Sequence, residues 1–165
     1  RSDWNLSGGG ELIDQGPHMI DLCSWFLGDL KLDYGLAKTF FWDMEVDDNA
    51  FLVLKDNRDR VAQIHVSCTE WKNLFSLEIY GKIGKLDLFG LGGSYGTERL
   101  TYYKMSAEMG PPETTAWEFP RNDQSFATEI NCLYDDIMMD RVPEPGLEEA
   151  YKVLKIIDQV YAREA

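Results

Sequence analysis

Alternation of apolar and polar residues through the middle of the chain is the feature that most restricts its fold. In residues 60–70 two sets of side chains alternate one by one, an apolar set of Ala62, Ile64, Val66 and Cys68 and a polar set of Gln63, His65, Ser67 and Thr69. Such alternation is typical of a strand with one buried face. Further strand-like runs occur at 51–54, 74–81, 85–90, 98–105 and 116–119. Several of the connecting segments are short, which favours antiparallel pairing, so we expect five or six antiparallel strands.

Helical periodicity replaces this alternation towards both ends of the chain. One helical face collects Leu12, Ile13, Gly16, Ile20, Cys23 and Leu27, and another collects Asp14, His18, Asp21 and Trp25. Ser7 is the expected N-cap, and Pro17 predicts either a kink or a helix that begins only there, because proline removes one helical hydrogen bond. Two more amphipathic helices are expected at 126–137 and 150–160. Strands segregated from helices in this way indicate an α+β fold.

Length and charge exclude several classes of protein. The 165 residues fit one domain, and 44% hydrophobic content is that of a folded chain. A net charge of −13 opposes binding to nucleic acid or to anionic lipid. No apolar run approaches the ~20 residues that a membrane-spanning helix needs.

The cysteines and the first residue add two expectations. Cys23, Cys68 and Cys132 stand among apolar residues and are odd in number, so we expect buried free thiols and a reducing, cytoplasmic location. The chain begins at Arg1 and enters its richest motif almost at once, which suggests a fragment of a longer protein.

Asp14 and His18 are the first candidates for chemistry. On a helix, residues four apart have Cβ atoms ~5 to 6 Å from each other, close enough for a carboxylate and an imidazole to share a proton directly or through a hydroxyl group. A histidine near a helix N-terminus is biased towards its neutral form, which can accept a proton. An exposed His–Asp pair without function is the competing interpretation, and spacing alone leaves both open. A metal triad with Asp21 is a third, although catalytic zinc sites commonly use more than one histidine.

Three other features allow a functional and a structural interpretation. The polar strand face that contains His65, with Trp71 beyond it, predicts either a sugar pocket or a subunit interface. Trp71 is equally consistent with an aromatic floor beneath a sugar ring and with an ordinary packing residue. The glycine-rich residues 90–96 do not fit the G-x-G-x-x-G pattern of a dinucleotide loop, so we expect an ordinary loop there.

Residues 7–29, SGGGELIDQGPHMIDLCSWFLGD, closely resemble the signature of the glucose-fructose oxidoreductase and inositol dehydrogenase family, Gfo/Idh/MocA. That signature runs GGG-x-L-x-D-x-G-x-H-x-x-D-x-x-x-W-x-x-G, and every fixed position is filled. The segments 46–54, 76–88, 125–137 and 143–162 resemble later parts of the family in the same order. The resemblance therefore covers nearly the whole chain, and it is loosest between residues 90 and 117.

The resemblance implies that residues 1–165 are the C-terminal, substrate-binding domain of such an enzyme. This domain is similar to that of dihydrodipicolinate reductase, with a largely antiparallel sheet and helices packed on one face. The family's N-terminal Rossmann domain, which binds most of the NAD or NADP, and its Glu-Lys-Pro segment are absent from this sequence.

Site residues carry over by position in the motif. Asp14 and His18 match the family's catalytic pair, with His18 as acid and base towards a sugar hydroxyl and Asp14 as its partner. Asp21 and Gly10 are expected to be supportive, and contacts with the cofactor are expected only near Gly9 and Gly10. His65 and Trp71 remain candidates for substrate binding, and no metal ion is expected.

The sequence therefore predicts the substrate-binding half of an NAD(P)-dependent oxidoreductase that acts on a secondary alcohol of a sugar, sugar derivative or cyclitol. Its expected partners are that substrate, its own Rossmann domain and further copies of itself through the sheet face, and the isolated fragment is expected to be inactive. Two alternatives stay open. One is a non-catalytic sugar-binding or dimerisation module, and the other is a metal-dependent lyase or hydrolase.

Overall fold

A computed structural model describes residues 2–92, 95–108, 110–120 and 123–164 of the chain. Two compact units are present. The helix–sheet unit consists of Arg1–Thr69 with Val142–Ala165, and the four-stranded unit consists of Glu70–Arg141. Within the described ranges, no helix is both long enough and apolar enough to cross a membrane.

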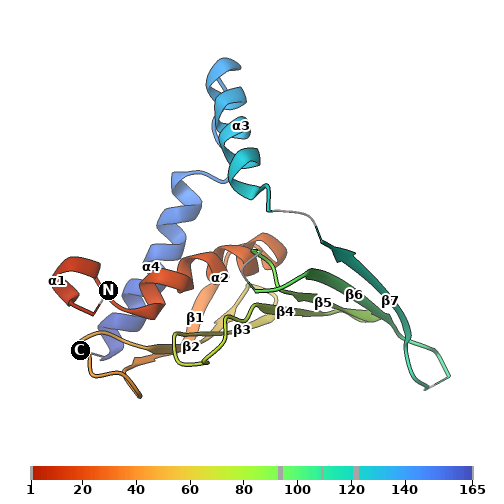
Figure 1. Cartoon of the computed structure of the whole chain (residues 1–165), viewed down its shortest axis with the longest axis horizontal. Coiled ribbons are helices and arrows are strands. Elements are labelled where there is room, and N and C mark those ends of the chain that lie inside the picture. Colours follow the sequence, from red (N-terminus) through yellow and green to blue (C-terminus); the bar gives the residue numbers. More distant parts are fainter. Residues whose placement is uncertain (1, 93–94, 109, 121–122, 165) are drawn as a thin grey trace. The chain divides into compact units, whose positions relative to one another are not determined.

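The helix–sheet unit packs two long helices on one antiparallel sheet (Figure 1). Its elements are α1 (Trp4–Ser7), α2 (Glu11–Leu27), β1 (Lys31–Lys38), β2 (Asn49–Lys55), β3 (Val61–Ser67) and α4 (Leu147–Glu164). The strands pair in the order β1-β2-β3, with Leu52 opposite both Gly35 and Ile64. Helix α2 lies against β2 and β3, and α4 lies against β1 and α2.

The core of this unit lies between the two helices and the sheet. Its fully buried side chains include Leu12, Ile20, Leu52, Leu54, Ile157 and Val160. Helix α4 approaches β1 so closely that a Cβ atom on Gly35 would lie 2.6 Å from the Val160 side chain. Glycine at position 35 is therefore a packing requirement rather than a source of flexibility.

The four-stranded unit is an antiparallel meander with one helix after it. Its elements are β4 (Ser76–Tyr80), β5 (Gly84–Phe89), β6 (Glu98–Lys104), β7 (Glu113–Phe119) and α3 (Ser125–Met138). The strands pair in sequence order, so that Asp87 of β5 lies opposite both Glu78 and Thr101. Few side chains here are buried, and Phe75 is the only buried hydrophobic one among the residues that the structure describes in this unit.

The α+β class and the antiparallel pairing are confirmed. The expected hairpins at 51–70 and 74–90 are β2–β3 and β4–β5, and α2 and α4 cover one face of their sheet. The strands form two sheets, of three and four strands, and the sequence analysis missed β1. That strand lacks regular alternation because its register shifts between Leu32 and Tyr34 and because it carries Gly35.

One alternative for the start of α2 and its expected N-cap are wrong. The helix begins at Glu11 and includes Pro17, so it does not begin only at the proline. Burial of Leu12, Gly16 and Ile20 on its inner face outweighs the low helix propensity of proline, as tertiary packing commonly does. Ser7 is not the N-cap of α2, because it ends the separate short helix α1 and Gly10 occupies the cap position.

The cysteines are free, as expected, but only Cys23 is partly buried, while Cys68 and Cys132 are exposed. The expected burial of Cys68 is wrong because β3 ends at Ser67. The alternation of the strand no longer controls the direction of the next side chain. Cys68 instead reaches the pocket described below.

Candidate active site

Asp47 holds the N-terminus of α2 in place of a local capping residue. Its carboxylate accepts hydrogen bonds from the backbone N–H groups of Gly10 (3.0 Å) and Leu12 (2.7 Å), and its backbone carbonyl accepts one from Glu11 (2.9 Å). The Tyr161 hydroxyl of α4 donates to the same carboxylate at 2.8 Å. Asp47 thus satisfies N–H groups that a helix start otherwise leaves without partners, and a negative charge there also suits the helix dipole.

Gly10 is required by this arrangement. A Cβ atom at position 10 would overlap the backbone carbonyl of Asp47, so the third glycine of the GGG motif lets the Asp47 segment approach the helix start. The pKa of Tyr161 is raised, first by burial and then by its hydrogen bond to Asp47. Tyr161 therefore stays a neutral donor to the carboxylate.

Asp48 fixes the loop between β1 and β2. Its carboxylate accepts hydrogen bonds from the consecutive backbone N–H groups of residues 40–42 at 2.7 to 2.9 Å, and from the Asn49 side-chain amide at 3.0 Å. Burial opposes ionisation of this side chain, but these hydrogen bonds outweigh it and lower the pKa of Asp48 to about 2. Two adjacent aspartates therefore hold two different segments, the start of α2 and the loop beside it.

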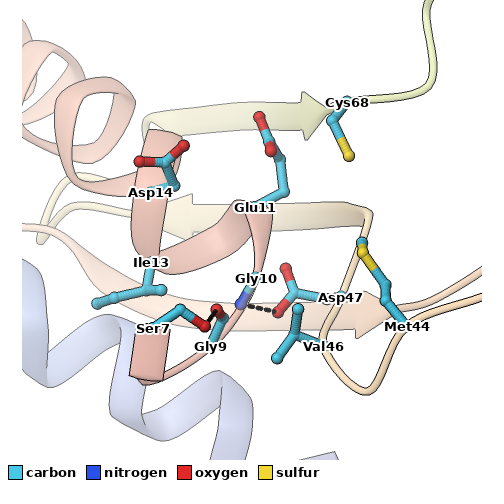
Figure 2. Close-up of a pocket in the computed structure, with 10 residues that line it drawn as sticks. All are labelled: Ser7, Gly9, Gly10, Glu11, Ile13, Asp14, Met44, Val46, Asp47 and Cys68. Carbon is cyan, nitrogen blue, oxygen red and sulfur yellow. Dashed lines mark hydrogen bonds between the residues drawn. The ribbon is translucent and has the colours of Figure 1, made fainter. Parts of the chain in front are cut away.

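A pocket of about 220 Å³ opens between the start of α2, this loop and the end of β3 (Figure 2). It is lined by Ser7, Gly9, Gly10, Glu11, Ile13, Asp14, Met44, Val46, Asp47 and Cys68. Among the residues that the structure describes, the lining contains three carboxylates, one thiol and one thioether, and no lysine, arginine or histidine. The Glu11 and Asp14 side chains leave α2 on the same side (Figure 2), which suits donors such as hydroxyl or ammonium groups.

The structure places part of the expected catalytic site at this pocket. Asp14, Gly9 and Gly10 line it, and Asp14 is partly buried. His18 lies four residues further along the same helix, is exposed and is not among the lining residues. Asp21 is also exposed on α2. The pairing of Asp14 with His18 remains a prediction that rests on their shared helix.

His65 is not brought to the pocket, and Trp71 belongs to the other unit. His65 faces away from α2 on β3, because its neighbours Ile64 and Val66 point into the core. Its ring stacks on Phe51 with centroids 4.3 Å apart, and its Nε2 lies 3.0 Å from the Asn49 side-chain oxygen. Trp71 belongs to the four-stranded unit and is 83% exposed. Their roles in substrate binding stay predictions.

Sequence reasoning missed two residues of this pocket. Glu11 stood only at a variable position of the family signature, and Asp47 was only part of a segment that resembles the family. The signal for Asp47 was its place beside a second aspartate directly before a buried strand, where paired polar side chains commonly satisfy backbone groups. Within the described ranges, no three His, Cys, Asp or Glu side chains converge so as to hold a metal ion.

A family model identifies the family of this chain, and solved structures share its fold. Residues 1–87 match the GFO/IDH/MocA C-terminal domain. A search of the curated proteins finds no match. Among solved structures, an NAD-binding oxidoreductase from Klebsiella pneumoniae is similar with a TM-score of 0.78 and 17% identity, over 98% of this chain and 50% of that one.

Two further structures were solved with ligands. A 3-ketoreductase from Actinomadura kijaniata, in complex with TDP-benzene and NADP, is similar with a TM-score of 0.74 and 18% identity, over 93% of this chain and 46% of that one. A levoglucosan dehydrogenase in complex with NADH and levoglucosan is similar with a TM-score of 0.74 and 17% identity, over 96% of this chain and 50% of its own. The chain thus spans about half the length of these structures, and at such identities the likeness concerns the fold.

Proposed function

Because this chain belongs to the GFO/IDH/MocA C-terminal domain family, we propose that it is the substrate-binding half of an NAD(P)-dependent oxidoreductase. The proposed substrate is a secondary alcohol of a sugar, sugar derivative or cyclitol. The observation that carries this proposal is the position of Asp14, which lines a pocket built from the GGG motif and the start of α2.

The nicotinamide cofactor is assigned to a separate domain. The described strands of both sheets pair only antiparallel, whereas a dinucleotide-binding fold is built from parallel βαβ units. The residues described here therefore do not form a Rossmann-type dinucleotide fold, and the proposal assigns the hydride chemistry to a cofactor held mainly by another domain.

The proposed task of this chain is to orient the substrate and to move one proton. His18 takes the proton from the substrate hydroxyl when the alcohol is oxidised and returns it in the reverse direction. Asp14, one helical turn earlier, orients the imidazole and stabilises its protonated form. The hydrogen bonds from the start of α2 to Asp47 hold the helix that carries both groups, so the geometry does not depend on a flexible loop.

A second role is supported by the face of the β1–β3 sheet that points away from α2 and α4. Tyr34, Phe51 and Val61 expose 53%, 38% and 54% of their surface on that face. A sheet face of this kind fits a contact between copies of the chain. The alternative function, a dimerisation or sugar-binding module without catalysis, rests on the same face.

The test uses the polypeptide that carries this chain together with a dinucleotide-binding domain. His18→Ala is expected to lower kcat about 10²- to 10⁴-fold, the usual contribution of a general acid or base, without changing the Kd for NAD(P). Asp14→Asn is expected to lower kcat as well. Asp158→Asn, which removes an exposed carboxylate on α4, is the control and should leave turnover unchanged. Normal turnover in His18→Ala would remove this histidine from the mechanism.

A further inference from the structure

We propose that the four-stranded unit carries a binding site for a small organic anion, a carboxylate or phosphate group on a flat ring, in a cleft beside the turn between β4 and β5. The lining of this tyrosine–lysine cleft includes Tyr80, Lys82, Gly84, Lys85, Tyr103 and Met105. The cleft shares no lining residue with the pocket at the start of α2. The inference is therefore independent of the proposed function.

Hydrogen bonds hold the walls of the cleft together. The Gly81 N–H donates to the Gly84 carbonyl at 2.9 Å and closes the turn. The Met105 N–H donates to the Ile83 carbonyl at 2.9 Å, which ties the end of β6 to the same turn. A Cβ atom on Gly84 would lie 2.6 Å from the Tyr103 carbonyl oxygen, so this glycine allows the start of β5 to lie close to β6. The cleft has a volume of about 440 Å³, which is within the range of small-molecule sites.

Lys85 lies between two aromatic rings in this cleft. It stands opposite Tyr80 of β4 and Tyr103 of β6 in the strand register. Its ammonium group lies 5.3 Å from the Tyr80 ring centroid and 5.7 Å from the Tyr103 ring centroid, within the reach of cation–π attraction. The Glu78 carboxylate pairs with the same ammonium group at 3.0 Å, and this hydrogen bond is the first cause of the raised pKa of Lys85. Lys85 therefore stays protonated and is held by three neighbouring side chains.

Lys82 adds a second positive charge at the turn. Its exposed side chain lines the cleft, and the described part of the lining contains no aspartate or glutamate. Glu78 pairs with only one of the two lysines, so one positive charge is left for an anion. Glu78 and Asp87 lie opposite each other further along the strands, and their charges would repel an anion there. The anionic group is therefore placed at the turn, beside Lys82.

The requirement for a ring follows from the rest of the lining. Tyr80 and Met105 line the cleft but remain 73% and 66% exposed. Contacts between aromatic rings add affinity beyond the area that they bury, and a methionine thioether adapts to the shape of a ring. The net charge of −13 also repels simple anions at a distance. A ring that carries an anionic group uses both the tyrosines and the lysines, whereas a bare anion or a neutral ring uses only one of them.

The test separates the ring from the charge with four probes. Phenyl phosphate, benzoate, inorganic phosphate and phenol are titrated separately into the 165-residue chain at pH 7 and constant ionic strength, while the backbone amide signals of Gly81, Gly84 and Met105 are followed by NMR. We expect saturable shifts at millimolar concentrations with phenyl phosphate and with benzoate, and the tighter of the two identifies the preferred anionic group. Inorganic phosphate and phenol should each bind about three- to tenfold more weakly, because each loses either the ring contact or the charge interaction.

Three variants assign the binding to the cleft. Lys82→Gln should weaken binding of both ring anions about three- to tenfold and leave phenol unaffected. Lys155→Gln, which removes an exposed lysine charge from α4 in the other unit, makes the same change in net charge and should leave all four affinities unchanged. Tyr80→Leu should reduce the preference for phenyl phosphate over inorganic phosphate.

Three results would each overturn the inference. The first is the absence of saturable shifts with both ring anions, and the second is equal affinity for phenyl phosphate and inorganic phosphate in the wild-type chain. The third is an equal effect of Lys82→Gln and Lys155→Gln, which would show that only the net charge matters.

Discussion

At the scale of single residues, two adjacent aspartates explain why the pocket keeps its shape. The Asp47 carboxylate accepts hydrogen bonds from the start of α2 and from α4, and the Asp48 carboxylate accepts hydrogen bonds from the loop before β2. Both side chains are buried, with 5% and 0% exposure. A buried carboxylate is tolerated only when hydrogen bonds replace its water, and here those bonds are donated by the segments that line the pocket.

Asp48 should make the free energy of unfolding of the chain depend on pH in the acidic range. The pKa of Asp48 is about 2 in the folded chain, against ~3.9 for an unperturbed aspartate. Between these values the unfolded state binds more protons than the folded state, so protonation favours unfolding. The contribution of Asp48 is fully present above about pH 4 and is lost as the pH falls through about 2.

Asp48→Asn should lower the free energy of unfolding by about 2 kcal/mol at pH 7, because an amide replaces a carboxylate that accepts several hydrogen bonds. Its stability should also fall less steeply than that of the wild-type chain between pH 4 and pH 2. Urea denaturation at pH 7, 4 and 3 measures both effects. Asp43→Asn, an exposed change in the same loop, is the matched control, and parallel pH profiles for Asp48→Asn and wild type would contradict the assignment.

At the scale of elements, the start of α2 depends on a glycine that no local signal explains. Gly10→Ala would push a methyl group into the Asp47 backbone and would disturb both hydrogen bonds from residues 10 and 12 to its carboxylate. We expect a loss of about 3 kcal/mol in stability, the range for disruption of a buried hydrogen-bond network.

Gly110→Ala is the control for that change, because nothing lies within 4 Å of a Cβ atom there, and it should shift stability by less than ~0.5 kcal/mol. Thermal or urea unfolding of the two variants measures the difference. Equal free energies of unfolding for Gly10→Ala and Gly110→Ala would mean that the start of α2 accommodates the added methyl group without loss of stability.

Sequence periodicity captured the elements whose patterns are local. The two faces of α2 and the alternation of β3 were readable because Leu12, Ile20 and Ile64 repeat at helical or strand spacing. Periodicity left open whether α2 begins before Pro17, because that depends on burial against strands that follow later in the chain. Strand β1 was missed for a similar reason, because its Gly35 is required only by the close approach of the Val160 side chain.

The candidate site likewise contains residues that the sequence predicted and residues that only the structure showed. Motif spacing identified Asp14 and the glycines before α2, because they lie within one short segment. The contribution of Asp47 depends on a contact 37 residues away in the chain, and the exposure of Cys68 depends on where β3 ends. Neither is encoded in a local pattern, so both needed the folded structure.

At the scale of the whole molecule, buried apolar surface is unevenly divided between the two units. Of the buried hydrophobic side chains in the described residues, all but Phe75 belong to the helix–sheet unit. Local opening is easiest where few apolar contacts are buried. The two units should therefore differ in stability even though both are rich in hydrogen-bonded strands.

Hydrogen exchange of the 165-residue chain should reveal this difference. Amides of β2, the central strand of its sheet, should exchange at least about tenfold more slowly than those of β5 and β6, because β2 opens only when the core around Leu52 and Leu54 opens. Leu52→Ala should cost about 2 to 5 kcal/mol and accelerate exchange in β2 while leaving β5 and β6 nearly unchanged. Similar protection in both units, or equal acceleration in both, would show that they open together and that buried apolar surface does not set their relative stability.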